Sequence, residues 1–143
     1  MKILMFSNTF FPQNGGVTQS ILTAYRQMTA LGHEVRLVAP DAQEPDDERP
    51  WLMRVPALPR VMGTEWTVPR PLPYRIRAGI ERFSPDIIHA HHPFLLGRSA
   101  VHMAQRMKVP CVFTCHTRYD LYAHLLRLGG PWMAHLVNDI VTR

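Results

Sequence analysis

Long hydrophobic runs are missing from this sequence, and charged residues are sparse. No stretch reaches the roughly 18 apolar residues that cross a bilayer as a helix, so no membrane span is predicted. The apolar start, residues 1–6, gives way to polar residues too soon for a secretory signal. Charged residues make up 19% and hydrophobic residues 46% of the 143 residues, which is typical of one globular domain. A cytoplasmic protein is therefore expected.

Cysteines are also few. The two present, Cys111 and Cys115, are four residues apart in an apolar segment. On one strand their Cα atoms would be roughly 13 Å apart, which is too far for a disulfide. We expect two reduced cysteines in the core, in agreement with a cytosolic setting.

Acidic residues are scarce over one part of the chain. The net charge is +5, and residues 49–82 hold seven arginines against two glutamates. Such a stretch could meet phosphate, nucleic acid or an anionic membrane surface, or it could be a solvated loop region. No nucleic-acid-binding motif accompanies it, so nucleic acid is not an expected partner. The arginines are Arg49, Arg54, Arg60, Arg70, Arg75, Arg77 and Arg82.

Short apolar runs alternate with segments of helical periodicity. This alternation predicts an α/β fold, a Rossmann-like doubly wound parallel sheet. The proline-rich residues 56–73 are interpreted as irregular. Strands are expected at 2–7, 34–39, 86–90 and 110–115, with a short one at 51–56, and helices at 17–31, 74–83, 95–107, 119–128 and from Pro131 on.

Three loops follow the carboxyl ends of predicted strands, where sheets of this class bind ligands: residues 8–16, 91–97 and 116–120. In the first, Gly15 and Gly16 precede a helix, whose free N–H groups suit a phosphate. A plain tight turn is the alternative. No G-x-G-x-x-G follows the first strand, which argues against an NAD-dependent enzyme.

Histidines gather around the other two loops. His89 and His91 alternate along a strand and should point to one side of it, while His92 points to the other. With His116 or Cys115 these histidines could form a metal site, but the Cys–His spacing matches no known zinc motif. We therefore expect no metal.

Three segments carry a resemblance to a known family. The opening residues 1–40 hold a strand, an aromatic–proline loop, Gly-Gly before a helix, and Leu-Gly-His-Glu-Val. Residues 86–94 read DIIHAHHPF, and residues 109–117 read VPCVFTCHT. Together they resemble the glycosyltransferases of family 4. Residues 116–124, HTRYDLYAH, are similar to members that glycosylate membrane lipids, such as diacylglycerol glucosyltransferases and phosphatidylinositol mannosyltransferases.

The resemblance implies the N-terminal, acceptor-side half of a GT-B fold in a retaining transferase. It uses a nucleotide-sugar donor and a lipid or sugar acceptor, without a metal or other cofactor. It places the catalytic His116 at the reaction centre and Gly15 and Gly16 at the donor diphosphate. It assigns acceptor contacts to His91, Arg118, Tyr119 and Asp120.

One departure concerns the second domain of the family, which carries a Glu-x7-Glu motif. No glutamate pair here has that spacing. Residues 1–143 are thus expected to be an incomplete N-terminal domain, inactive alone, whose partner is a C-terminal donor-binding domain outside the chain. A peripheral position at the inner face of an anionic membrane is a further option. The competing hypothesis is a stand-alone Rossmann-like binding module without turnover.

Overall fold

A parallel sheet forms the centre of the molecule. The structure is a computed structural model that describes residues 1–41, 49–58 and 67–116. The strand order is β3-β2-β1-β6-β7, with all neighbours parallel. The strands are β1 (Lys2–Phe6), β2 (Glu34–Pro40), β3 (Leu52–Val55), β6 (Ile87–Ala90) and β7 (Cys111–Phe113). The predicted Rossmann-like class is confirmed.

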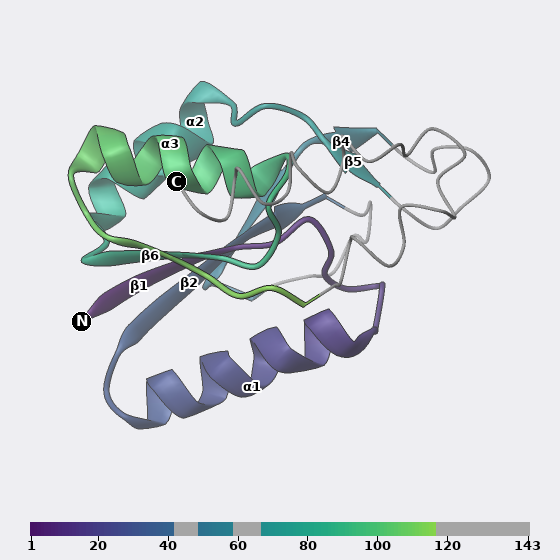
Figure 1. Cartoon of the computed structure of the whole chain (residues 1–143), viewed down its shortest axis with the longest axis horizontal. Coiled ribbons are helices and arrows are strands. Elements are labelled where there is room, and N and C mark those ends of the chain that lie inside the picture. The colour runs from purple at the N-terminus through teal and green to yellow at the C-terminus, as the bar shows by residue number, and fades with distance from the viewer. Residues whose placement is uncertain (42–48, 59–66, 117–143) are drawn as a thin grey trace.

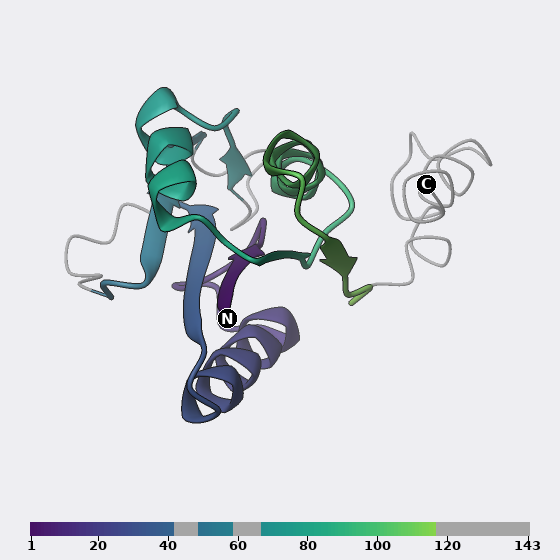
Figure 2. The same cartoon turned by 90° about the vertical axis from the view of Figure 1, so that its left-hand side faces the viewer.

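Helices cover both faces of this sheet (Figures 1 and 2). Helix α1 (Gly16–Ala30) lies on one face, and α2 (Tyr74–Phe83) and α3 (Leu96–Met107) lie on the other. Helix α1 ends where Gly32 turns the backbone into the left-handed region, at φ +82°, which glycine adopts without strain. No helix in the described part of the chain is long and apolar enough to cross a bilayer.

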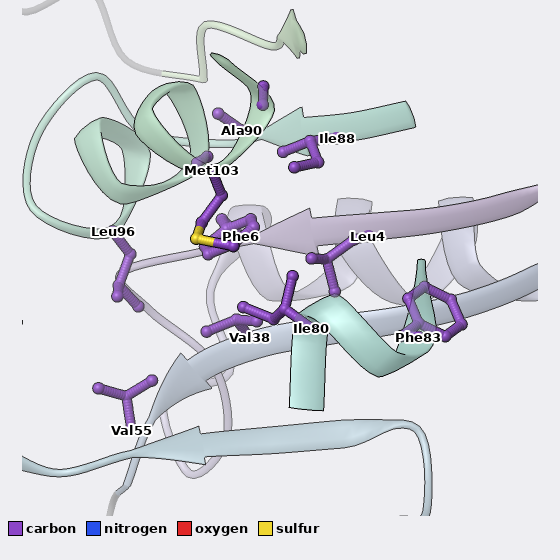
Figure 3. Close-up of a cluster of buried hydrophobic side chains, with 12 residues drawn as sticks. Leu4, Phe6, Val38, Val55, Ile80, Phe83, Ile88, Ala90, Leu96 and Met103 are labelled. Atoms are coloured by element: carbon purple, nitrogen blue, oxygen red, sulfur yellow. The ribbon is translucent and has the colours of Figure 1, made fainter. Parts of the chain in front are cut away.

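The core has two layers because β1 is apolar on both sides. Leu4 and Phe6 pack into the layer under α2 and α3, whereas Ile3 and Met5 pack into the layer with Ile21 of α1. Figure 3 shows the first layer. A strand covered on both faces must be a continuous apolar run, as the KILMF segment is.

Three features of the sequence interpretation need correction. The segment expected to be irregular contains a small antiparallel pair, β4 (Ala57–Leu58) with β5 (Val68–Pro69), because two-residue strands leave no periodicity to detect. Cys111 and Cys115 form no disulfide within the described residues, and both are exposed rather than in the core as expected. Strand β7 is shorter than predicted and lies at an edge of the described sheet, where a residue is not covered from every side.

The chain reverses its direction of travel across the sheet at β1. From β1 it runs outward through β2 to β3, and then crosses to β6 and β7 on the other side. The loops after β1 and β6 therefore diverge at one edge of the sheet, the usual ligand position in such folds.

Candidate functional site

The side chain of Asn8, just after β1, joins the two loops at this edge. Its Nδ2 donates to the carbonyl of Phe94 at 3.0 Å, and its Oδ1 accepts from the Leu96 N–H at 3.0 Å. Its backbone N–H donates to Nδ1 of His92 at 3.2 Å. Asn8 thus supplies an acceptor to the first turn of α3 from across the sheet.

The loop after β6 turns tightly into α3. A Cβ added at Gly97 would lie 1.6 Å from the carbonyl oxygen of His92, so this close approach admits only glycine. Leu95 takes a positive φ of 53° at the same turn. These constraints fix the direction in which the chain leaves His91 and His92.

Three histidine rings lie against one another where β6 and β7 end. The Nδ1 of His91 and the Nε2 of His116 are 2.8 Å apart, and the Nε2 of His89 is 2.7 Å from Oγ1 of Thr114. The His91 ring centroid lies 4.1 Å from that of His89 and 5.1 Å from that of His116. His91 is only 2% exposed. The predicted common orientation of His89 and His91 is confirmed, and His92 points instead toward Asn8.

Burial keeps these histidines neutral. It lowers the pKa of His91 to about 3, with further lowering from the neighbouring His89, His116 and His92. Burial, and then His116, lowers the pKa of His92 to about 4. The pKa of His89 is lowered by burial and by His116, and that of His116 by burial. Near pH 7 the cluster is therefore a set of neutral hydrogen-bonding groups rather than a cationic patch.

The Gly15–Gly16 loop is open by contrast. A hollow of about 400 Å³ lies over the start of α1, with Gly15 and Gly16 exposed in its wall. No atom lies within 4 Å of a Cβ built on either glycine. The first turn of α1 has no acidic side chain, and Oγ1 of Thr18 anchors the loop by donating to the Gln13 carbonyl at 2.6 Å. Such a helix start can receive an anion.

The structure thus brings together only some of the residues singled out in the sequence. His91 and His116 are in contact, whereas Gly15 and Gly16 belong to the separate hollow. Arg118, Tyr119 and Asp120 lie outside the described residues, as does the predicted helix at 119–128. Among the described residues, no group of three or more His, Cys, Asp or Glu side chains could hold a metal ion.

Sequence reasoning missed Asn8, Gly97 and Thr114. Asn8 could have been singled out as a polar residue directly after a buried strand. The need for glycine at position 97 depends on the path of the preceding loop, and no local pattern announces it. Thr114 was part of a predicted strand, and its hydroxyl faces His89 only because β6 and β7 are neighbours.

Comparisons with known proteins agree with this architecture. Residues 14–143 match the model of Glycosyltransferase Family 4. The chain is 31% identical over 150 residues to a GDP-mannose-dependent alpha-mannosyltransferase of Mycolicibacterium smegmatis. This match covers 95% of this chain and 39% of the relative. It is 30% identical over 146 residues to an alpha-monoglucosyldiacylglycerol synthase of Streptococcus pneumoniae, covering 99% and 32%. The corresponding synthase of Acholeplasma laidlawii is 28% identical over 134 residues, covering 87% and 32%. The chain therefore spans about a third to two fifths of these relatives.

Proposed function

Because the chain belongs to glycosyltransferase family 4, we propose that it is the acceptor-side domain of a retaining GT-B glycosyltransferase. In this proposal the sugar comes from a nucleotide-sugar donor and goes to a lipid or sugar acceptor. The observation that carries the proposal is the hydrogen-bonded pair of His91 and His116 at the carboxyl ends of β6 and β7. A C-terminal domain beyond this chain would hold most of the donor, so residues 1–143 alone would not turn over.

The two loops divide the chemistry between them. The open glycine loop would receive the donor diphosphate, because backbone N–H groups at a helix start stabilise negative charge. The neutral His116 would orient a sugar or acceptor hydroxyl beside it. In a retaining transfer the acceptor proton leaves with the departing phosphate, so His116 need not act as a base. His91, Arg118, Tyr119 and Asp120 are the proposed acceptor side.

The names of the relatives guide the choice of substrates. They include transferases named for GDP-mannose and synthases named for monoglucosyldiacylglycerol. We therefore propose a membrane lipid as the first acceptor to test, with GDP-mannose and other nucleotide sugars as donors.

Replacing His116 tests the site. We expect His116→Ala in the full-length protein to lower transfer at least roughly tenfold, because an oriented hydrogen-bonding group is lost at the reaction centre. The matched control is His102→Ala, which removes an exposed histidine on α3. Radiolabelled sugar transfer to lipid extracts measures the rate, and thermal unfolding checks the fold. Turnover near that of wild type would refute the role of His116, and nucleotide-sugar binding without turnover would favour the binding module.

The arginine-rich stretch supports a second part of the proposal, a peripheral position on the cytoplasmic membrane face. Arg54 is committed to structure, since it donates to the carbonyls of Pro40 and Phe11. In contrast, Arg70 and three arginines of α2 are exposed to solvent. The α2 arginines are Arg75, Arg77 and Arg82, and Arg75 and Arg82 line an open hollow of about 660 Å³.

Charge reversal on α2 tests the membrane contact. We expect Arg75→Glu with Arg77→Glu to lower co-sedimentation with anionic vesicles roughly tenfold or more, since each basic residue near such a surface contributes about 1 kcal/mol. Binding of the unaltered protein should weaken as salt rises. Arg26→Glu is the matched control, because this exposed arginine belongs to α1 on the opposite face of the sheet. Failure to bind even at low salt would rule the contact out.

A further inference from the structure

The hydrogen bond between His91 and His116 can run in only two directions when both rings are neutral. Either Nδ1 of His91 carries the proton and donates, or Nε2 of His116 carries it and donates, across the same 2.8 Å. Each direction fixes the tautomer of both rings, since a neutral imidazole has one N–H and one bare nitrogen. The direction therefore decides which kind of group His116 offers to a substrate.

The surroundings of His91 discriminate between the two directions. Its Nε2 is buried and has no hydrogen-bond partner within the described structure. If His116 were the donor, His91 would carry its proton on Nε2, as a buried N–H without an acceptor. Orphaned buried donors are rarer than under-used acceptors. A bare Nε2 is the better fit to this buried position, and it requires the proton to be on Nδ1.

Packing holds the ring where this hydrogen bond is made. His91 lies between the rings of His89 and His116, and its backbone N–H donates to the Phe6 carbonyl at 2.9 Å. His89 is engaged with Thr114 rather than with His91. At 2% exposure, His91 has little surface left for direct contact with an acceptor.

We infer that His91 is a positioning residue that donates from Nδ1 to Nε2 of His116 and so holds His116 in the tautomer with its proton on Nδ1. His116 then offers an N–H donor, suited to a sugar hydroxyl or a phosphate oxygen of the nucleotide sugar. Its Nε2 already accepts the hydrogen bond from His91, so it does not take the proton of the hydroxyl group to which the sugar is transferred. This inference rests on the proposed function, and it assigns His91 an effect through His116 in place of a direct acceptor contact.

Imidazole ¹⁵N chemical shifts test the tautomer without any substrate. They distinguish a protonated nitrogen from a bare one, and the His116 signals are identified in full-length protein by their loss in His116→Ala. We expect a protonated Nδ1 and a bare Nε2 on His116, with the reverse state or a tautomer mixture appearing in His91→Phe. A protonated Nε2 on His116 in the wild-type protein would overturn the inference.

Three replacements of His91 test the effect on transfer. Asn retains an N–H near the position of Nδ1, Phe retains the flat shape without the hydrogen bond, and Asp offers only an acceptor. We expect Phe to lower kcat roughly 10- to 100-fold, as with other partners that orient a functional histidine, while Asn restores most of it. Asp should raise the pKa of His116, which the same ¹⁵N shifts report when they are followed against pH.

The positioning role would be contradicted by equal losses of kcat in the Phe and Asn variants, provided that thermal unfolding curves show both variants to be folded. An unraised pKa of His116 in His91→Asp would contradict the direct contact between the two residues as well. If the wild-type protein transfers no sugar at all, the proposed function fails, yet the ¹⁵N spectrum still decides the tautomer.

Discussion

Two loops at the same edge of the sheet are built in opposite ways. The loop after β6 is largely buried apart from Leu95, forms hydrogen bonds with Asn8, and holds neutral histidines. The loop after β1 ends in two exposed glycines over an open hollow. The first holds its groups in place before any ligand arrives, and the second leaves space for one. A transferase needs both properties, since a reacting group must be fixed while the donor must enter and leave.

A fall in pH should reveal the largest difference between the two loops, because only the loop after β6 contains buried histidines. The folded-state pKa values of His91 and His92, about 3 and 4, lie below the ordinary value of 6.5. Between these values the unfolded chain binds more protons, so stability is full above pH 6.5 and falls as the pH drops toward 4. We expect the free energy of unfolding to decrease by about 2 kcal/mol for each of the two histidines between pH 7 and pH 5.

Urea unfolding at a series of pH values measures this loss. His92→Asn, which keeps an acceptor for the Asn8 N–H, should reduce the slope substantially. If the free energy of unfolding is the same at pH 7 and pH 5, the loop after β6 is solvated, as the loop after β1 is.

A methyl group at Gly97 should have the next largest effect. Alanine there would place its Cβ 1.6 Å from the His92 carbonyl oxygen, so the backbone must move. We expect Gly97→Ala to lower the free energy of unfolding by about 3 kcal/mol. Gly79→Ala is the control, because its Cβ meets only the flexible end of Met53 at 2.9 Å. Equal stability of the two variants in urea would mean that the β6 loop is less constrained than its geometry indicates.

Gly16→Ala should change stability least. No atom lies near the added Cβ, and alanine is the better helix former, so stability should shift by less than about 1 kcal/mol. Donor affinity should fall, because the methyl group enters the hollow meant for the diphosphate. In the full-length protein, titration with a nucleotide sugar measures the donor affinity, and thermal unfolding measures the stability separately. Undiminished donor affinity would leave the glycine loop as a plain turn.

The sequence predicted most of the fold because the sheet depends on local pattern. The KILMF run of β1 and the amphipathic faces of α1 to α3 are short-range signals. Strand β7 shows what local pattern does not predict. Its apolar residues look like those of a central strand, yet Val112 is 45% exposed, because sheet position is a property of topology.

The site was predictable in part for the same reason. Alternation along β6 placed His89 and His91 together, and the neighbouring carboxyl ends brought His116 to them. The role of Asn8 was not predictable, since it bonds Phe94 and Leu96, residues more than 80 positions away. The direction of each histidine hydrogen bond likewise depends on burial, which no sequence pattern states.

The order of the strands also bears on how such proteins diverge. The chain between β2 and β6, with β3, β4, β5 and α2, builds one flank of the molecule and then returns to the centre. A change in that flank must preserve the core layer that it shares with the centre, because Ile80 and Phe83 of α2 pack in one cluster with Leu4 and Phe6 of β1. Arg54 of β3 also ties this flank to the loop after β1, because its side chain donates to the Phe11 carbonyl. A changed flank would have to keep this hydrogen bond for the loop to hold its position.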